Sequence, residues 1–132
     1  MSNQIFVRDV MKTTFDMMDG LCTVREALKR MQHVQTKTLI IDKRSEHDEY
    51  GIVVIGDIAQ LIAENRSPNR VSLYEIMNKP TVSVHAEMNI RYASQLFLRF
   101  GLSRAPVLDE KRQIIGMVSL TDMVLKGLTH LE

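Results

Sequence analysis

Gly116-Met-Val-Ser-Leu-Thr-Asp122-Met-Val124 is the stretch that decides the fold, because the chain carries nearly the same stretch earlier, as Gly51-Ile-Val-Val-Ile-Gly-Asp57-Ile-Ala59. The two copies lie 65 positions apart. That period is longer than most solenoid repeats and occurs only twice, so we expect a pseudo-symmetric pair of units that closes on itself. Function is then expected where the two copies meet.

Other stretches repeat in the same order. Arg8-Asp-Val-Met11 corresponds to Tyr74-Glu-Ile-Met77, and Val24-Arg-Glu-Ala27 to Ile90-Arg-Tyr-Ala93, both at an offset of 66. We therefore divide the chain into a first repeat, 1–68, and a second repeat, 69–132. The only linker-like stretch, 65–69, is short, which predicts units that pack together rather than separate domains.

The first repeat reads as helix, strand, strand, helix. Thr23 followed by Glu26 is a capping box, and it predicts an amphipathic helix over 24–34. The apolar runs 38–41 and 50–55 flank a charged tract, which is typical of two strands joined by a polar loop. A short helix is predicted over 58–63.

The second repeat follows the same plan. A helical turn is predicted over 73–77, an extended stretch over 80–84, and a helix over 90–100 that begins after Asn89 and ends at Gly101. Strands are predicted over 106–108 and 114–118, and a closing helix over 121–128. The fold class is α/β of the α+β type, with two pseudo-symmetric repeats, each a small sheet packed with helices.

Composition narrows the class of partner. The 132 residues include 17 basic and 16 acidic side chains, a net charge of +1, which provides no strong field for a nucleic acid backbone or an anionic membrane. No apolar run reaches the length of a membrane span, and no secretory signal is evident. The single Cys22 suits a reducing compartment, so we expect a cytoplasmic protein.

With the repeat and the motif established, the chain resembles a tandem cystathionine-β-synthase (CBS) domain pair, also called a Bateman module. Members carry a glycine, two apolar residues, a Ser or Thr, two more residues and an Asp at a strand-to-helix junction, and Gly116 to Asp122 matches every position. The strand start Ala105-Pro106-Val107 is also in place. The resemblance covers almost the whole chain and implies a regulatory sensor without an attached enzyme, channel or transporter domain.

The resemblance implies an adenosine-containing ligand in clefts between the repeats, chiefly at the second motif. Asp122 would accept hydrogen bonds from the ribose hydroxyls, and Ser119 would donate to the ribose or a phosphate. Backbone N–H groups from Ser119 through Thr121 to Asp122, at the opening of a helix, would favour an anion. The other residues implied at this cleft are Arg104 for a phosphate, with Ala105 and Pro106 beside it, and Pro80, Thr81 and Val82 for the adenine.

The first motif is the imperfect copy. Val54 stands where the second motif has Ser119 and cannot form a side-chain hydrogen bond, whereas Asp57 is retained. We match Lys37-Thr38-Leu-Ile40 to Arg104-Ala-Pro-Val107, which would keep a cation and lose the proline. A cleft with Asp57, Val54, Lys37 and Thr38 is therefore expected to be weaker, differently selective or unused.

Metal binding and catalysis find little support. His47 beside Glu46, Asp48 and Glu49 is the best metal cluster, but neighbours on a charged loop rarely converge on one ion, so no metal site is expected. No histidine is spaced to act as a base for Ser119, and no paired carboxylates stand out, so we do not expect an enzyme. No cofactor is required.

The sequence is compatible with three functions. The first is a sensor that binds AMP, ADP, ATP or another adenosyl compound such as S-adenosylmethionine and signals to an unknown protein effector. The resemblance also implies a homodimer, for which the helices over 24–34 and 90–100 would supply the surface. The second is a ligand-free interaction scaffold built on the same dimer, and the third is an unrecognised hydrolase or transferase.

Overall fold

The computed structural model describes residues 4–127 and divides into two compact units. The first, Phe15–Thr81, contains Asp57 and is called the Asp57 unit below. The second combines the N-terminal segment up to Thr14 with the chain from Val82 onward, and is called the Asp122 unit. The segment up to Thr14 belongs to the first sequence repeat but joins the Asp122 unit. Residues 69–81 belong to the second sequence repeat but join the Asp57 unit.

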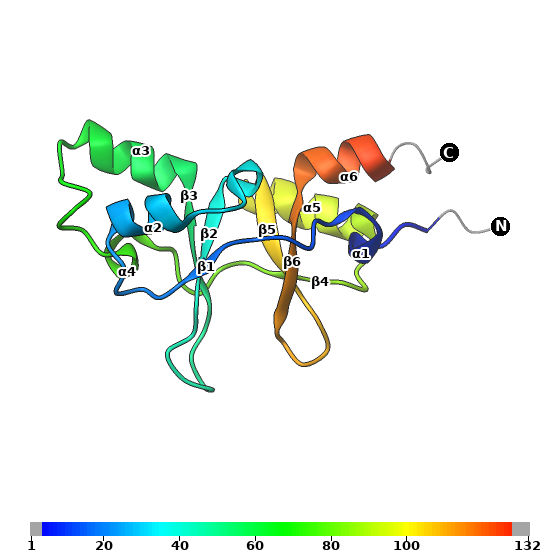
Figure 1. Ribbon diagram of the computed structural model, residues 1–132. Coiled ribbons are helices and arrows are strands. Elements are labelled where there is room, and N and C mark those ends of the chain that lie inside the picture. Colours follow the sequence, from blue (N-terminus) through cyan, green and yellow to red (C-terminus); the bar gives the residue numbers. More distant parts are fainter. Residues whose placement is uncertain (1–3, 128–132) are drawn as a thin grey trace. The chain divides into compact units, whose positions relative to one another are not determined.

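The Asp57 unit is a three-stranded sheet with helices on one side (Figure 1). In strand order β1-β2-β3, β1 runs parallel to β2 and β2 antiparallel to β3. The elements are β1 (Met17–Met18), α2 (Val24–Arg30), the 3-10 helix η1 (Val34–Thr36), β2 (Thr38–Ile41), β3 (Gly51–Val54), α3 (Ile55–Ala63) and α4 (Leu73–Ile76).

Alternate residues of these strands build the core of the Asp57 unit. Leu39 and Ile41 of β2 and Val53 of β3 are buried against the helices, and Thr38 and Val54 lie on the opposite face of the sheet. The remaining buried members come from the helices and the segment before α4: Val24, Ala27, Ile58, Leu61, Val71 and Leu73. Because Val71 and Leu73 belong to this cluster, the segment up to Thr81 joins this unit.

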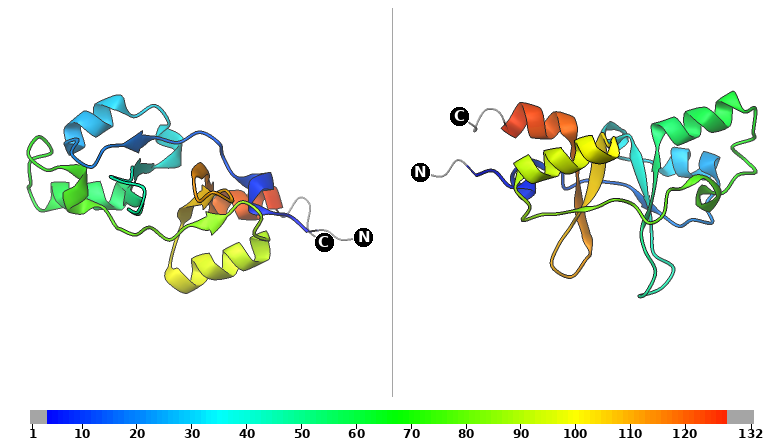
Figure 2. Two further views of the ribbon diagram at one scale, coloured as in Figure 1. Left: turned by 90° about the horizontal axis from the view of Figure 1, so that it is seen from below. Right: turned by 180° about the vertical axis from the view of Figure 1, so that it is seen from behind.

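The Asp122 unit repeats the arrangement with a second sheet, in order β4-β5-β6 (Figure 1). Here β4 runs parallel to β5, and β5 antiparallel to β6. The elements are α1 (Val7–Val10), β4 (Val84–His85), α5 (Ile90–Phe100), β5 (Arg104–Leu108), β6 (Ile114–Ser119) and α6 (Leu120–Gly127). Both views in Figure 2 place α5 beside α6. The hydroxyl oxygen of Ser94 in α5 lies 3.8 Å from the sulfur of Met123 in α6.

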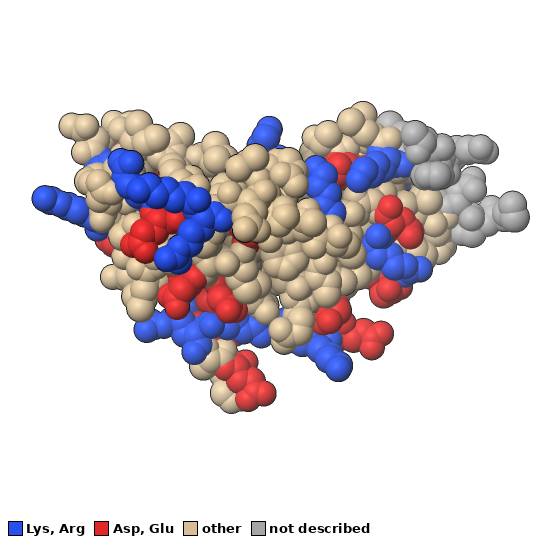
Figure 3. Space-filling model, in the orientation of Figure 1, with Lys and Arg blue, Asp and Glu red and all other residues tan. Residues whose placement is uncertain are grey.

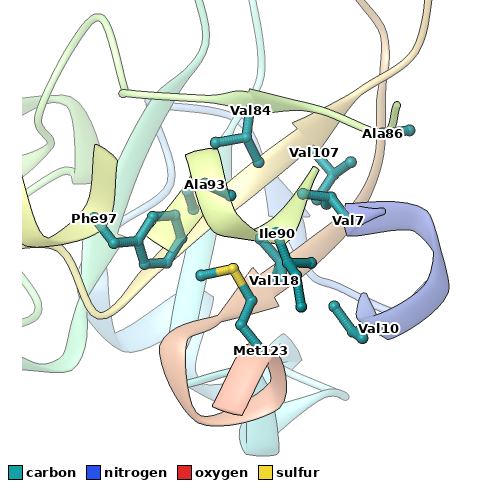
Figure 4. Packing of buried hydrophobic residues seen from close by; sticks show 11 residues of the cluster. Val7, Val10, Val84, Ala86, Ile90, Ala93, Phe97, Val107, Val118 and Met123 are labelled. Atoms are coloured by element: carbon teal, nitrogen blue, oxygen red, sulfur yellow. The ribbon is translucent and has the colours of Figure 1, made fainter. Parts of the chain in front are cut away.

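The core of the Asp122 unit draws on three helices. Val7 and Val10 of α1 pack with Ile90 of α5 and Met123 of α6, over Val118 of β6 (Figure 4). These valines explain why the N-terminal segment belongs to this unit, since each is at most 1% exposed.

Several local predictions are confirmed. The Thr23 hydroxyl oxygen accepts the N–H of Glu26 at 3.1 Å and donates to its carboxylate at 3.0 Å. The Asn89 side chain accepts the N–H of Arg91 at 2.8 Å at the start of α5, and Gly101 ends that helix with a φ of 64°.

Other boundaries differ from prediction. The helix predicted over 24–34 ends at Arg30, because the buried carboxylate of Asp16 accepts the backbone N–H groups of Gln32 and His33, at 3.0 and 2.8 Å. The helix predicted over 58–63 begins earlier, at Ile55, and only Val84 of the stretch 80–84 lies in a strand. The closing helix begins at Leu120, and its predicted end, Leu128, lies outside the described residues.

The described surface carries charge of both signs. On the face shown in Figure 3, basic and acidic side chains are interspersed rather than gathered into a patch of one sign. Within residues 4–127, no helix is long and apolar enough to cross a membrane.

Candidate functional site

The motif glycine of each unit admits a neighbouring backbone. A Cβ on Gly116 would overlap the carbonyl oxygen of Lys12, and a Cβ on Gly51 would lie 2.7 Å from the sulfur of Met77 and 3.4 Å from the carbonyl oxygen of Asn78. Glycine is thus required at Gly116, where the segment after α1 crosses the motif strand, whereas the tightest contact at Gly51 is to the flexible Met77 side chain.

That close approach places Lys12 and Asn78 at equivalent positions. Lys12 exchanges two backbone hydrogen bonds of 2.8 Å with Met117 of β6. In the same way, Asn78 exchanges bonds of 2.8 and 2.9 Å with Ile52 of β3. Met117 and Ile52 are themselves the second residues of the two motifs, so Lys12 and Asn78 are counterparts.

Asp122 lies in the first turn of α6 with a side chain only 12% exposed. Its backbone N–H donates to the Ser119 hydroxyl oxygen at 3.0 Å, so Ser119 caps the helix. Its carboxylate lies 3.8 Å from the ammonium of Lys12 and 3.9 Å from that of Lys126. Both distances exceed hydrogen-bond length, so the two oxygens retain their capacity to accept hydrogen bonds.

Asp57 occupies the same place in α3 but uses its carboxylate differently. One oxygen accepts the backbone N–H of Val54 at 2.9 Å, and the same oxygen lies 3.5 Å from the side-chain amide nitrogen of Asn78. Val54 has no hydroxyl to cap the helix, so the carboxylate takes the capping role. A capping box has two hydrogen bonds, and each motif forms a different one. In α6 the side chain before the helix accepts the N–H of the aspartate, whereas in α3 the aspartate side chain accepts the N–H of the residue before the helix.

The strand register corrects one sequence match. Arg104 of β5 pairs with Ser119 of β6, whereas the residue that pairs with Val54 is Thr38. Likewise, the carbonyl of Lys37 accepts the N–H of Ile55, as the carbonyl of Ser103 accepts that of Leu120. The counterpart of Arg104 is thus Thr38 and not Lys37, and the cation expected at that position of the first motif is absent.

The structure brings together four of the residues predicted at the second motif. Arg104, Ser119 and Asp122 are joined by the strand pairing and the cap described above, and exposed Thr121 lies between the last two. Ala105 is fully buried in the helix-side cluster, so only its backbone faces the motif, whereas Pro106 lies on the same face of the sheet as Arg104.

The predicted adenine wall is divided between the units. Exposed Pro80 and half-buried Thr81 lie in the Asp57 unit, and Val82 begins the other. The N–H of Thr81 donates to the carbonyl of Tyr50 at 3.2 Å. This bond ties the segment after Asn78 to the start of β3.

The charged loop between β2 and β3 is anchored to the same segment. The ammonium of Lys79 lies 2.7 Å from the Asp48 carboxylate, and this contact, with backbone N–H groups of Arg44 and Glu49, lowers the pKa of Asp48 from 3.8 to about 2. Asp48 is therefore committed to an ion pair. Among residues 4–127, no group of three or more His, Cys, Asp and Glu side chains could hold a metal ion.

Lys12 and Asn78 were not among the predicted site residues. The offset of 66 already matched Met11 with Met77, so the following pair could have been read from the sequence. What the sequence could not show is that the glycine brings this pair to the motif aspartate.

Known proteins share this sequence pattern and this fold. A family model described as CBS domain matches residues 73–127. The structure of a hexameric CBS-CP12 protein from bloom-forming cyanobacteria is 32% identical with a TM-score of 0.86, and the match covers 93% of this chain and 71% of that one.

Two further structures share the fold at lower identity. The CBS domain pair of protein MJ0100, in complex with 5'-methylthioadenosine and S-adenosyl-L-methionine, is 23% identical with a TM-score of 0.77, over 96% of this chain and 98% of that one. The CBS domain protein PAE2072 from Pyrobaculum aerophilum, complexed with AMP, is 16% identical with a TM-score of 0.79, over 95% and 99%.

A curated relative is longer than this chain. The uncharacterised protein MK0525 of Methanopyrus kandleri is 26% identical over 102 residues, which are 76% of this chain and 51% of the relative. The chain thus matches about half the length of that protein.

Proposed function

The chain belongs to the CBS domain family as a tandem pair, and we propose that it is a regulatory module that binds an adenosine-containing ligand at Asp122 and signals to a partner protein. The MJ0100 pair is in complex with 5'-methylthioadenosine and S-adenosyl-L-methionine, and PAE2072 is complexed with AMP, which supports the ligand class. The preferred site is the one in the Asp122 unit.

The observation that carries the proposal is the state of the Asp122 carboxylate. It is nearly buried, it is held at the start of a helix, and among the described residues its only ion-pair partners are two lysines at 3.8 and 3.9 Å. A carboxylate with both oxygens available can accept hydrogen bonds from two vicinal hydroxyls. The ribose of an adenosine compound presents that pair of hydroxyls.

Neighbouring groups suit a phosphate. Arg104 stands across from Ser119, and Lys12 extends from the segment that crosses β6. A guanidinium can form two parallel hydrogen bonds to phosphate oxygens, and an ammonium adds a point charge. The first-turn N–H groups of α6 add a favourable dipole.

The site at Asp57 is proposed to be weaker for the same ligand. One carboxylate oxygen is already bonded to the backbone of Val54, and Thr38 stands where the second unit has Arg104. Of the other residues predicted at this weaker site, Lys37 is retained as part of this proposal.

The proposal also covers the oligomeric state of the chain and the protein to which it signals. We retain a homodimer, in the cytoplasm, without catalytic activity, that passes ligand occupancy to a protein effector. Exposed apolar side chains on α5, Tyr92, Leu98 and Phe100, each more than half exposed, support an interface on that helix. The competing account is a scaffold that uses the same surface without any ligand.

Thermal unfolding with a ligand panel separates the two accounts. The chain is melted alone and with AMP, ADP, ATP, NAD or S-adenosylmethionine at about a hundred times a micromolar dissociation constant. Binding to the native state then adds about 2.7 kcal/mol, which raises the melting temperature by several degrees. A selective rise supports the sensor, and no rise with any compound favours the scaffold.

A further inference from the structure

The two motif aspartates have surroundings of different charge. The difference in charge comes from three pairs of equivalent positions. In the Asp122 unit they are Lys12, Arg104 and Lys126, and in the Asp57 unit they are Asn78, Thr38 and Leu61. Every cation of the second motif is thus replaced by an uncharged side chain at the first.

At Asp122 the cations outnumber the carboxylate. Two ammonium groups lie within 4 Å of it, and Arg104 is paired with the helix-capping Ser119. The Asp122 side chain is only 12% exposed, so its carboxylate is less well solvated than one at an open surface, while the Lys12 and Lys126 side chains are 38% and 50% exposed. The local field favours a ligand that carries negative charge.

At Asp57 the carboxylate stands alone. Among residues 4–127 it has no ion-pair partner, and its nearest side-chain donor is the neutral amide of Asn78 at 3.5 Å. Lys79, the next residue, is already bound to Asp48 at 2.7 Å. Lys37 is the counterpart of Ser103 and is exposed. A phosphate placed here would meet an uncompensated negative charge.

We propose that the two sites sort adenosine compounds by charge, so that the Asp122 site takes phosphorylated adenosine and the Asp57 site takes adenosyl compounds that are uncharged or positive. This inference rests on the proposed function, since it requires that both aspartates hold a ribose. It would let one module respond to two chemically distinct adenosyl pools.

AMP and adenosine are the probes, because they differ only in the phosphate. Each is titrated calorimetrically into two single-site variants of the full chain, Asp57→Ala and Asp122→Ala. We expect AMP to bind the Asp57→Ala variant at least about tenfold more tightly than adenosine does, as is typical of a gained charge-assisted contact. In the Asp122→Ala variant, adenosine should bind as tightly as AMP or more tightly.

Reciprocal substitutions provide the matched control. Lys12→Asn, in the Asp57→Ala background, should weaken AMP binding about tenfold and leave adenosine binding unchanged or tighter. Asn78→Lys, in the Asp122→Ala background, should strengthen AMP binding selectively. Thermal unfolding without ligand identifies any variant that has lost its fold, and Asp57→Asn or Asp122→Asn then replaces the alanine variant.

The possible outcomes are distinct. The same AMP-to-adenosine ratio in both single-site variants, or reciprocal swaps that leave the ratio unchanged, would overturn charge sorting while leaving the sensor proposal intact. Binding of neither compound to the unaltered chain would overturn the sensor proposal, and charge sorting with it. Opposite preferences that exchange with the Lys12 and Asn78 swaps would establish the inference.

Discussion

Lys12 and Asn78 occupy the same position in the two units, yet one brings an ammonium within 3.8 Å of Asp122 and the other brings an amide within 3.5 Å of Asp57. Both are placed by backbone pairing with the motif strand, next to a glycine. The charge at each aspartate is therefore set by a residue outside the seven-residue motif.

The first prediction concerns the motif glycine. Gly116→Ala should destabilise the chain by about 1–3 kcal/mol, because the new methyl group would overlap the Lys12 carbonyl. Gly56→Ala is the matched control. A Cβ there meets nothing within 4 Å, and alanine in helix α3 should raise stability by about 0.5–1 kcal/mol. Urea unfolding measures both, and similar changes in the two variants would contradict the packing argument.

The second prediction concerns the helix cap. Ser119→Val copies the first motif and removes the acceptor for the N–H of Asp122, so we expect a loss of about 0.5–2 kcal/mol. Ser119→Thr keeps the hydroxyl and should retain most of the stability. If the valine and threonine variants melt at the same temperature, the cap contributes nothing.

The third prediction concerns pH. Because the pKa of Asp48 is lowered from 3.8 to about 2, its pair with Lys79 contributes its full stability above about pH 3.8 and loses it as the pH falls through about 2. Lys79→Met should therefore destabilise the chain at pH 7, and the difference from the unaltered chain should shrink below pH 4.

Denaturant unfolding at several pH values from 7 to 2 tests this. Lys111→Met serves as the control, since Lys111 lies on the other hairpin loop and has no ion-pair partner within residues 4–127. A difference for Lys79→Met that stays constant over the whole range would argue against the ion pair.

Local signals allowed much of the fold to be predicted. The caps at Thr23 and Asn89 and the stop at Gly101 each act over at most four residues, so the sequence alone indicates them. The end of α2 could not be found this way. It depends on Asp16, whose carboxylate takes the backbone donors of residues sixteen and seventeen positions away.

The site was predicted less completely, for a related reason. Asp122 and Ser119 stand in one short motif, and the match to the repeat singles them out. The counterpart of Arg104 depends on strand register, which shifted the match by one residue from Lys37 to Thr38. Lys12 is far from the motif in the sequence, and it reaches the site only because its backbone pairs with Met117 of β6.

The most direct test of the account is calorimetric titration of AMP into the unaltered chain, Asp122→Ala and Asp57→Ala. Removal of the ribose acceptor should abolish AMP binding at the Asp122 site, so that Asp122→Ala keeps only the weaker binding at Asp57 while the chain stays folded, and Asp57→Ala should bind AMP with little change. Unchanged AMP affinity in Asp122→Ala, or an equal loss in Asp57→Ala, would contradict the assignment of Asp122 as the principal ligand-binding residue.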